Sequence, residues 1–254
     1  MMLILPDFRR LELAPQEPNF PDPAVLRELA AGDIELSRLW HLLVVGELKI
    51  VSTSSVGDRA LAELTPGSRE KFGSLPRLSD RLLFERVLEG ECPKAVAAEV
   101  GVSPASLSTR CASILSWIGC GGSVSRTAPL VSMAVLAGRG VRLARARVDA
   151  LAGDGRPRWL VSVTNPAESL RAMLSPCEYD VARYSIDGTR LAEIALLRGT
   201  TQRTVANQLA SVFRKLDVSG RGALRALAVR LQASARGVST RTMTIAETSP
   251  MVVL

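Results

Sequence analysis

The chain has 254 residues, of which 47% are hydrophobic and 22% are charged, a balance typical of proteins with one large or two small folded domains. No stretch approaches the roughly 20 apolar residues that a membrane-spanning helix needs, and the N-terminus lacks the basic segment of a secretion signal. The four cysteines include no Cys-x-x-Cys pair, which argues against a zinc site or a disulfide framework. We therefore expect a cytoplasmic protein that has reduced thiols and needs no metal or other cofactor.

The net charge of +7 is unevenly distributed along the chain. Residues 1–72 carry 8 basic and 11 acidic side chains, whereas residues 138–172 carry 7 and 3, and residues 173–236 carry 10 and 5. A basic region of this kind is the electrostatic footprint of a protein that binds the phosphate backbone of nucleic acids. The alternative is a basic surface that contacts only solvent.

Two short helices are expected before residue 46. Asp22 and Pro23 suit the N-cap and first turn of a helix that runs to about Ala31. Asp33 suits the N-cap of a second helix, in which apolar residues recur around Trp40. So apolar a helix must be buried, and we favour docking within the chain over a surface for a protein partner or a dimer.

The chain contains an internal duplication with an offset of 98 residues. At this offset, residues 95–118 align without a gap with residues 193–216, and glycines coincide in the flanking turns. An alternating pattern precedes each copy and predicts a β-hairpin, over residues 47–64 in the first copy and 141–163 in the second, with turns at 55–58 and 153–155. Because a lone hairpin is marginally stable, each should pack on its neighbouring helices or pair with the other.

The predicted fold class is mainly α with small β-hairpins. An N-terminal helical segment (residues 1–45) precedes a hairpin plus four-helix unit (46–137) and a second such unit (138–233). A tail rich in serine and threonine follows (234–254), and it is either loose or forms a final strand.

The second copy has the pattern of a helix, a glycine turn and a polar-faced helix. Leu174-Ser175-Pro176-Cys177-Glu178 predicts a helix start, and Gly199 suits the left-handed end of the next helix. Thr200 and Thr201 follow, and a hydroxyl there suits the N-cap of the helix after that. That last helix has an apolar stripe on one side. The opposite side carries donors suited to phosphates and base edges, namely Arg203, Asn207, Gln208, Ser211, Arg214 and Lys215. By periodicity alone, a surface helical hairpin without a ligand fits equally well.

Residues 174–231 resemble the four-helix LuxR-type (NarL/FixJ-like) helix-turn-helix DNA-binding domain. The matching residues are Leu174, Ser175, Pro176, Glu178, Ile194, Ala195, Gly199, Thr204, Val205, Leu209, Arg214, Lys215, Leu216 and Arg221. The first copy, at about residues 76–136, resembles the same domain in a more diverged form. The resemblance implies binding to double-stranded DNA, typically as dimers that meet through the fourth helix. We therefore expect a homodimer or an internal pseudo-dimer.

The resemblance also assigns roles by position. Ala206, Asn207 and Ala210 follow the Thr-Val pair and would face base edges; Asn207 suits an adenine, and the alanines suit only thymine methyl groups. Phosphate or flanking contacts would come from Arg203, Gln208, Arg214 and Lys215, and Thr201, Thr204 and Ser211 complete the predicted DNA-binding set. Gln208 replaces the family's usual histidine, and Arg198 its usual leucine before the glycine. The first copy offers Ser108, Thr109 and Arg110, and its few cations predict weak DNA binding or none.

The sequence gives little support to an enzyme. No G-x-S-x-G, H-E-x-x-H or Walker-type motif occurs, and the single histidine, His41, lies in an apolar run that is typical of a core or boundary position. The first hypothesis is a DNA-binding transcriptional regulator, associated with the nucleoid, in which the second copy reads DNA and the first acts as a pseudo-dimer partner. The alternative is a protein-interaction adaptor that keeps the fold and has lost sequence-specific DNA binding.

Overall fold

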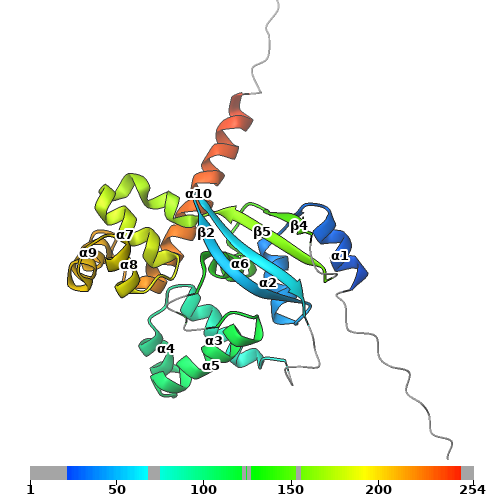
Figure 1. Ribbon diagram of the computed structural model, residues 1–254, viewed down its shortest axis with the longest axis horizontal. Helices are drawn as coiled ribbons and strands as arrows, with labels where there is room; N and C mark the ends of the chain where they lie inside the picture. The colour runs from blue at the N-terminus through cyan, green and yellow to red at the C-terminus, as the bar shows by residue number, and fades with distance from the viewer. Residues whose placement is uncertain (1–21, 68–74, 122–123, 125–126, 153–155, 247–254) are drawn as a thin grey trace, which may run out of the picture.

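The computed structural model contains a five-stranded antiparallel sheet with several groups of helices beside it (Figure 1). The structure describes residues 22–67, 75–121, 124, 127–152 and 156–246, with only the backbone course given for 236–246. The fold is therefore mixed α and β, with more helix than strand. The predicted mainly α class is right in the helices and too coarse in the strands, because the two hairpins join in one sheet.

Both halves of the chain contain a hairpin followed by four α-helices, but α1, β1 and α2 occur only in the first half and η3 only in the second. The first half contains α1 (Pro23–Ala30), β1 (Asp33–Ile34), α2 (Leu36–Val44), β2 (Leu48–Val56), β3 (Arg59–Pro66), α3 (Leu78–Leu88), α4 (Pro93–Glu99), α5 (Pro104–Trp117) and α6 (Pro129–Gly138). The second half contains β4 (Ala146–Leu151), β5 (Arg158–Thr164), the 3₁₀ helix η3 (Pro166–Met173), α7 (Pro176–Ile186), α8 (Leu191–Leu197), α9 (Gln202–Lys215) and α10 (Arg221–Ala246).

The duplication predicted from the sequence extends to the backbone. Helices α3, α4 and α5 have the same bounds as α7, α8 and α9 once 98 is added to each residue number. The turn before α4 has Gly90 with a φ of 100°, and its counterpart Gly188 has a φ of 85°. Gly101 and Gly199, with φ of 72° and 59°, end α4 and α8 in the same left-handed conformation.

The two hairpins pair with each other through β3 and β5, giving the strand order β1-β4-β5-β3-β2. Ala62 pairs with Val161, and Glu63 pairs with Leu160. At the 98-residue offset, Val161 is the counterpart of Glu63, and Leu160 is the counterpart of Ala62. The register is therefore unchanged when the two hairpins are exchanged, as across a two-fold axis. Of the two arrangements that the sequence left open for the hairpins, the structure has the pairing of one hairpin with the other.

The edge of the sheet beside β4 differs from the prediction. Asp33 does not cap a helix; it lies in β1, and Glu35 takes the N-cap position of α2 without a side-chain cap bond. Strand β1 pairs with the start of β4 and so satisfies backbone groups at that edge. Residues 141–145, predicted as strand, form a connection instead, and the predicted turn at 153–155 lies outside the described residues.

The N-terminal helices dock within the chain. Helix α1 begins as predicted, with the Asp22 carboxylate accepting a hydrogen bond from the Ala24 N–H at 2.7 Å. Helix α2 packs on α6, and the Trp40 Nε1–H donates to Glu85 Oε1 at 2.9 Å. The apolar residues of α2 are buried, so they are not available to a protein partner or a dimer interface, the alternative left open by the sequence.

The tip of the first hairpin anchors the helices of the second copy. Ser55 Oγ and Asn165 Nδ2 both donate to Asp187 Oδ1 at 2.8 Å, and Arg183 donates to the Gly57 carbonyl at 2.7 Å. Helix α10 also packs against η3, α6 and α3. The second copy has separate small cores beneath α7, α8 and α9, whereas the first copy shares one core with the sheet, α1 and α2.

Helix α10 is longer than the sequence predicts. It continues to Ala246, so residues 234–246 are helical rather than loose or a strand. No proline occurs between Arg221 and Pro250, so no proline ring interrupts the helix before Ala246. Residues 247–254 of the predicted tail lie outside the described residues.

Candidate nucleic-acid interface

Helix α9 is fixed by its N-cap and by its buried stripe. Thr201 Oγ1 accepts a hydrogen bond from the Thr204 N–H at 3.1 Å, which satisfies one of the free backbone donors at the helix start. Val205 and Leu209 are buried with residues of α7 and α8, and Val212 is buried with residues of α7 and α10. The sequence predicted the stripe and a threonine cap at Thr200 or Thr201, of which the structure has Thr201; together they determine which side of α9 faces outward.

The outward side of α9 carries one stripe of exposed residues. Arg203, Ala206, Asn207, Ala210 and Arg214 recur at helical spacing and are all exposed. Among the described residues, the side chains of Arg203, Asn207 and Arg214 form no hydrogen bond or ion pair with one another or with any other residue. Their donors are therefore open to an external ligand.

Three other predicted contact residues are held by the protein itself. Lys215 Nζ forms an ion pair with Glu178 Oε2 at 3.1 Å, and Ser211 Oγ donates to Glu178 Oε1 at 3.2 Å. Gln208 Oε1 accepts from Arg198 at 2.8 Å. The structure thus divides the predicted residues of α9 into an open stripe, a group tied to α7 and α8, and the pair Thr201 and Thr204, whose hydroxyls bond to each other at 2.9 Å.

Glu178 is the residue that organises this group. It caps α7, where it accepts hydrogen bonds from the Ser175 N–H and hydroxyl, and the Ser175 hydroxyl in turn accepts from the Glu178 N–H. The Ser175 backbone N–H, together with Lys215 and the Ser175 hydroxyl, lowers the pKa of Glu178 to about 2. The sequence identified Glu178 only as part of a helix start, because its partner Lys215 lies far along the chain.

The arginines of residues 138–172 differ from those of α9. Five of the seven cationic side chains in this segment form ion pairs within the chain, namely those of Arg139, Arg145, Arg147, Arg158 and Arg171. Their partners include Glu89, Asp33 and Glu63 from the first half. Much of the positive charge that the sequence places in this segment is therefore neutralised internally.

The first copy presents a less basic helix, α5, at the equivalent position. The counterparts of Arg203 and Arg214 on α5 are Ala105 and Ser116. Ser108 and Thr109 are exposed, and Thr109 Oγ1 donates to the Ala105 carbonyl of its own helix at 3.1 Å. Arg110 lies 3.5 Å from Asp80, the counterpart of Glu178. The exposed face of α5 therefore lacks an unpaired cation among the described residues.

Two arginines of α10 donate hydrogen bonds to backbone carbonyls of other segments. Arg221, which matches the LuxR-type pattern, donates to the Thr189 carbonyl at 3.0 Å. Arg225, which the sequence reasoning missed, is fully buried and donates to the carbonyls of Ile186 and Val124, which joins the two copies. Burial and the nearby Arg221 lower the pKa of Arg225 to about 10, so it stays charged at neutral pH.

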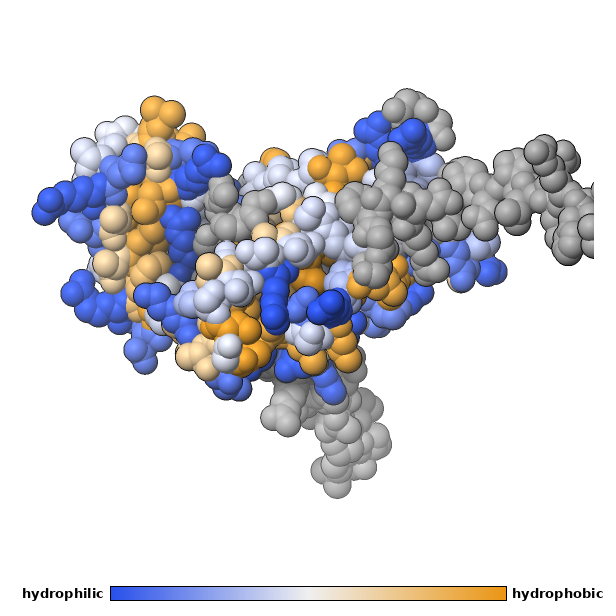
Figure 2. Space-filling view, turned by 90° about the horizontal axis from the view of Figure 1, so that it is seen from below, coloured by the Kyte–Doolittle hydropathy of each residue, from blue (hydrophilic) through white to orange (hydrophobic). Residues whose placement is uncertain are grey.

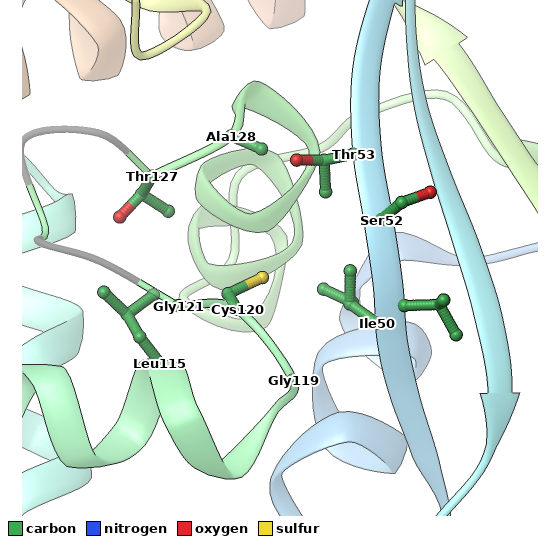
Figure 3. Close-up of a pocket in the computed structure, with 10 residues that line it drawn as sticks. Ile50, Ser52, Thr53, Leu115, Gly119, Cys120, Gly121, Thr127 and Ala128 are labelled. Atoms are coloured by element: carbon green, nitrogen blue, oxygen red, sulfur yellow. The ribbon is translucent and has the colours of Figure 1, made fainter. Parts of the chain in front are cut away.

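A small cavity lies between β2 and the end of α5 (Figure 3). Its volume is about 140 Å³, and it is lined by Ile50, Thr53, Leu115, Cys120 and Ala128 among others. Burial raises the pKa of Cys120 to about 11, which keeps the thiol protonated at neutral pH.

His41 is exposed on α2, contrary to the expected core or boundary position. The described residues hold no group of three His, Cys, Asp or Glu side chains suited to a metal ion.

Comparisons with known proteins add no family to this description. No family model matches the chain, and no curated protein or solved structure matches it significantly. Among the described helices, none is both long enough and apolar enough to cross a membrane.

Proposed function

We propose that the protein is a DNA-binding transcriptional regulator of the LuxR type, in which α9 of the second copy enters the major groove of double-stranded DNA. In this proposal the chain is not an enzyme, and it acts in the cytoplasm at the nucleoid. The observation that carries the proposal is the open stripe of α9. Its two arginines have no ion-pair partner among the described residues, whereas most cations of the preceding segment are paired.

The arrangement of α8 and α9 supports placing α9 in the major groove. Helices α8 and α9 are joined at Gly199, with a φ of 59°, and α9 begins at the capping residue Thr201. A helix, a tight turn and a second helix with a free polar face is the arrangement in which the second helix reads DNA. The exposed Thr204 hydroxyl at the start of α9 lies near the positive end of the helix dipole, which favours a phosphate.

The first copy acts as an internal partner rather than as a second reader. Its helix α6 contacts α10, so the fourth helices of the two copies meet within one chain. Its recognition-position helix α5 offers hydroxyl groups and no unpaired cation. One chain would then occupy one half-site, and homodimers would be needed only for a two-part operator.

The test is a titration of a duplex DNA pool at several salt concentrations, followed by fluorescence anisotropy. We expect binding at low ionic strength that weakens steeply with salt, because phosphate contacts release counterions. Arg203→Ala with Arg214→Ala should reduce the log–log salt slope by about 1.8, since each lost phosphate contact contributes about 0.9.

A matched control removes the same charge elsewhere. Arg142 and Arg156 are exposed and lie on the connections before β4 and β5. Arg142→Ala with Arg156→Ala should leave the salt slope of the unaltered chain in place. Equal losses in the two double variants would show that net charge, and not α9, binds DNA.

One observation favours the alternative function of a protein-interaction adaptor. Leu196 and Leu197 at the end of α8 are 83% and 63% exposed. Figure 2 shows an apolar band on the lobe that contains α7, α8 and α9. Exposed leucines side by side are typical of a surface that binds protein.

The two functions are separable with one variant. Leu196→Gln with Leu197→Gln removes the apolar pair and leaves the stripe of α9 intact. If the protein is a DNA reader, this variant should bind duplex DNA with unchanged affinity. If it is an adaptor, the unaltered chain should co-purify with a stoichiometric protein and no nucleic acid, and the variant should lose that protein.

A further inference from the structure

We propose that α9 is selective for a short A·T-containing word, in which Asn207 pairs with adenine and Ala206 and Ala210 contact thymine methyl groups. This inference rests on the proposed DNA-binding function and specifies what its reading surface recognises.

The open stripe has large side chains at its ends and small ones near its middle. Arg203 and Arg214 are separated by eleven positions, which at about 1.5 Å per residue is roughly 16 Å along the helix axis. The major groove of B-DNA is about 12 Å wide. Arginines at this separation can reach phosphates on both walls of the groove while the middle of the helix faces the bases.

Ala206 and Ala210 let the helix approach the groove floor closely. Each presents a single exposed methyl group and no hydrogen-bonding atom. The only apolar group that the base pairs display in the major groove is the C5 methyl of thymine. An alanine that meets a thymine therefore buries apolar surface, whereas an alanine that meets another base edge leaves a polar atom without a partner.

Asn207 is the only amide of the stripe, and among the described residues its side chain is unpaired. Its amide offers one donor and one acceptor side by side, which matches the N6 and N7 atoms of adenine. It lies directly after Ala206 and three residues before Ala210, so all three can face neighbouring base pairs.

The structure removes the competing readers. Gln208 accepts a hydrogen bond from Arg198 at 2.8 Å, and Ser211 donates to Glu178 at 3.2 Å. Neither side chain can turn to a base without breaking that bond. The word is therefore short, about two to three base pairs, and its information is concentrated in A·T pairs.

The test has two stages that use the full-length chain. First, duplexes are selected from a random pool by their binding to the protein, and the enriched word is determined. Second, each thymine of that word is replaced in turn by uracil, which removes only the methyl group. We expect a loss of about fourfold in affinity at one or two thymines, close to the value of one buried methyl group, and no loss at the others.

Variants of matched position complete the test. Asn207→Ala should reduce discrimination for adenine about tenfold at one position while binding to random duplex is kept. Thr109→Ala changes the counterpart of Asn207 on α5, where the hydroxyl bonds only to its own helix at Ala105. This control should leave the enriched word and the uracil effect unchanged.

The outcomes separate the inference from the proposed function. Salt-dependent duplex binding with no enriched A·T word, or with equal affinity for thymine and uracil at every position, would overturn the inference and leave DNA binding intact. A chain that fails to bind any duplex at low ionic strength would overturn the proposed function itself.

Discussion

Gly119 and Asp217 occupy equivalent positions after α5 and α9, and both adopt the left-handed backbone conformation, with φ of 90° and 51°. Their surroundings differ. A Cβ atom on Gly119 would lie 2.1 Å from the Ile50 carbonyl oxygen, where the first copy meets the sheet. Asp217 is exposed. One backbone conformation is thus retained in both copies, although only the first copy requires glycine for close packing.

Asp217→Gly should stabilise the protein by about 0.5–1 kcal/mol, because glycine adopts a positive φ without the steric cost of a Cβ atom. Gly119→Asp should destabilise it by about 1–3 kcal/mol, because the new side chain must displace the Ile50 backbone. Urea unfolding of both variants measures these free energies. A loss of stability in Asp217→Gly would mean that the carboxylate has a stabilising contact of its own.

The hydrogen bond between Trp40 and Glu85 should contribute to the free energy of unfolding. Glu85 is 5% exposed, and its carboxylate accepts from Trp40 at 2.9 Å and lies 3.3 Å from Arg81. Trp40→Phe should cost about 1–3 kcal/mol, because one acceptor of a buried carboxylate loses its donor. Thermal or urea unfolding measures this cost. Combining Trp40→Phe with Glu85→Leu should cost less than the sum of the single changes, and strict additivity would contradict the pairing.

Glu178 gives a pH dependence with a definite sign. Its pKa in the folded protein, about 2, lies below the ordinary value of a glutamate. The ionised form is therefore favoured by folding, and this stabilisation is present above about pH 4.5 and is lost as the pH falls toward 2. Glu178→Gln should show a shallower loss of stability than the unaltered chain between about pH 5 and pH 2, as followed by circular dichroism. Parallel curves would exclude this role of Glu178.

Glu178 also sets the number of cations available on α9. Since Lys215 is paired with Glu178 at 3.1 Å, Lys215→Ala should leave the salt slope of DNA binding nearly unchanged. Glu178→Gln releases Lys215 and should increase that slope by about 0.9, the contribution of one phosphate contact. Anisotropy titrations at three or more salt concentrations measure both slopes. A reduced slope in Lys215→Ala would show that the ion pair opens on DNA.

Local chemistry made the helices predictable. The helix start at 174–178, a threonine cap before α9 and the Gly199 turn depend on residues within a few positions of one another, and the structure has all three; it adds that Ser175 and Glu178 form a capping box and that Thr201 is the cap. Strand β1 was missed because two residues carry no periodicity, and its partner in β4 is more than one hundred positions away.

The sequence predicted which residues of α9 belong to the candidate interface, but not which of their side chains are free to bind DNA. The stripe of α9 follows from helical spacing, so its members could be named from the sequence. Which of them are free depends on tertiary contacts, such as Arg198 to Gln208 across the glycine turn and Lys215 to Glu178 across the lobe. The charge count of residues 138–172 likewise could not show that Arg139 and Arg145 find acidic partners in the first half of the chain.

The symmetric register of β3 and β5 bears on how the two copies differ. Two identical hairpins would form the same pairing across the axis of a homodimer, and every surface charge would then occur twice. Because both hairpins belong to one polypeptide, the two copies are always present in equal number. The sequence of one copy can also change without a change in the other. At the 98-residue offset, Arg203 aligns with Ala105 and Arg214 aligns with Ser116. Linkage in a single chain thus permits an asymmetric assembly on a symmetric sheet, in which α9 of one copy exposes two arginines and the equivalent positions on α5 of the other copy are uncharged.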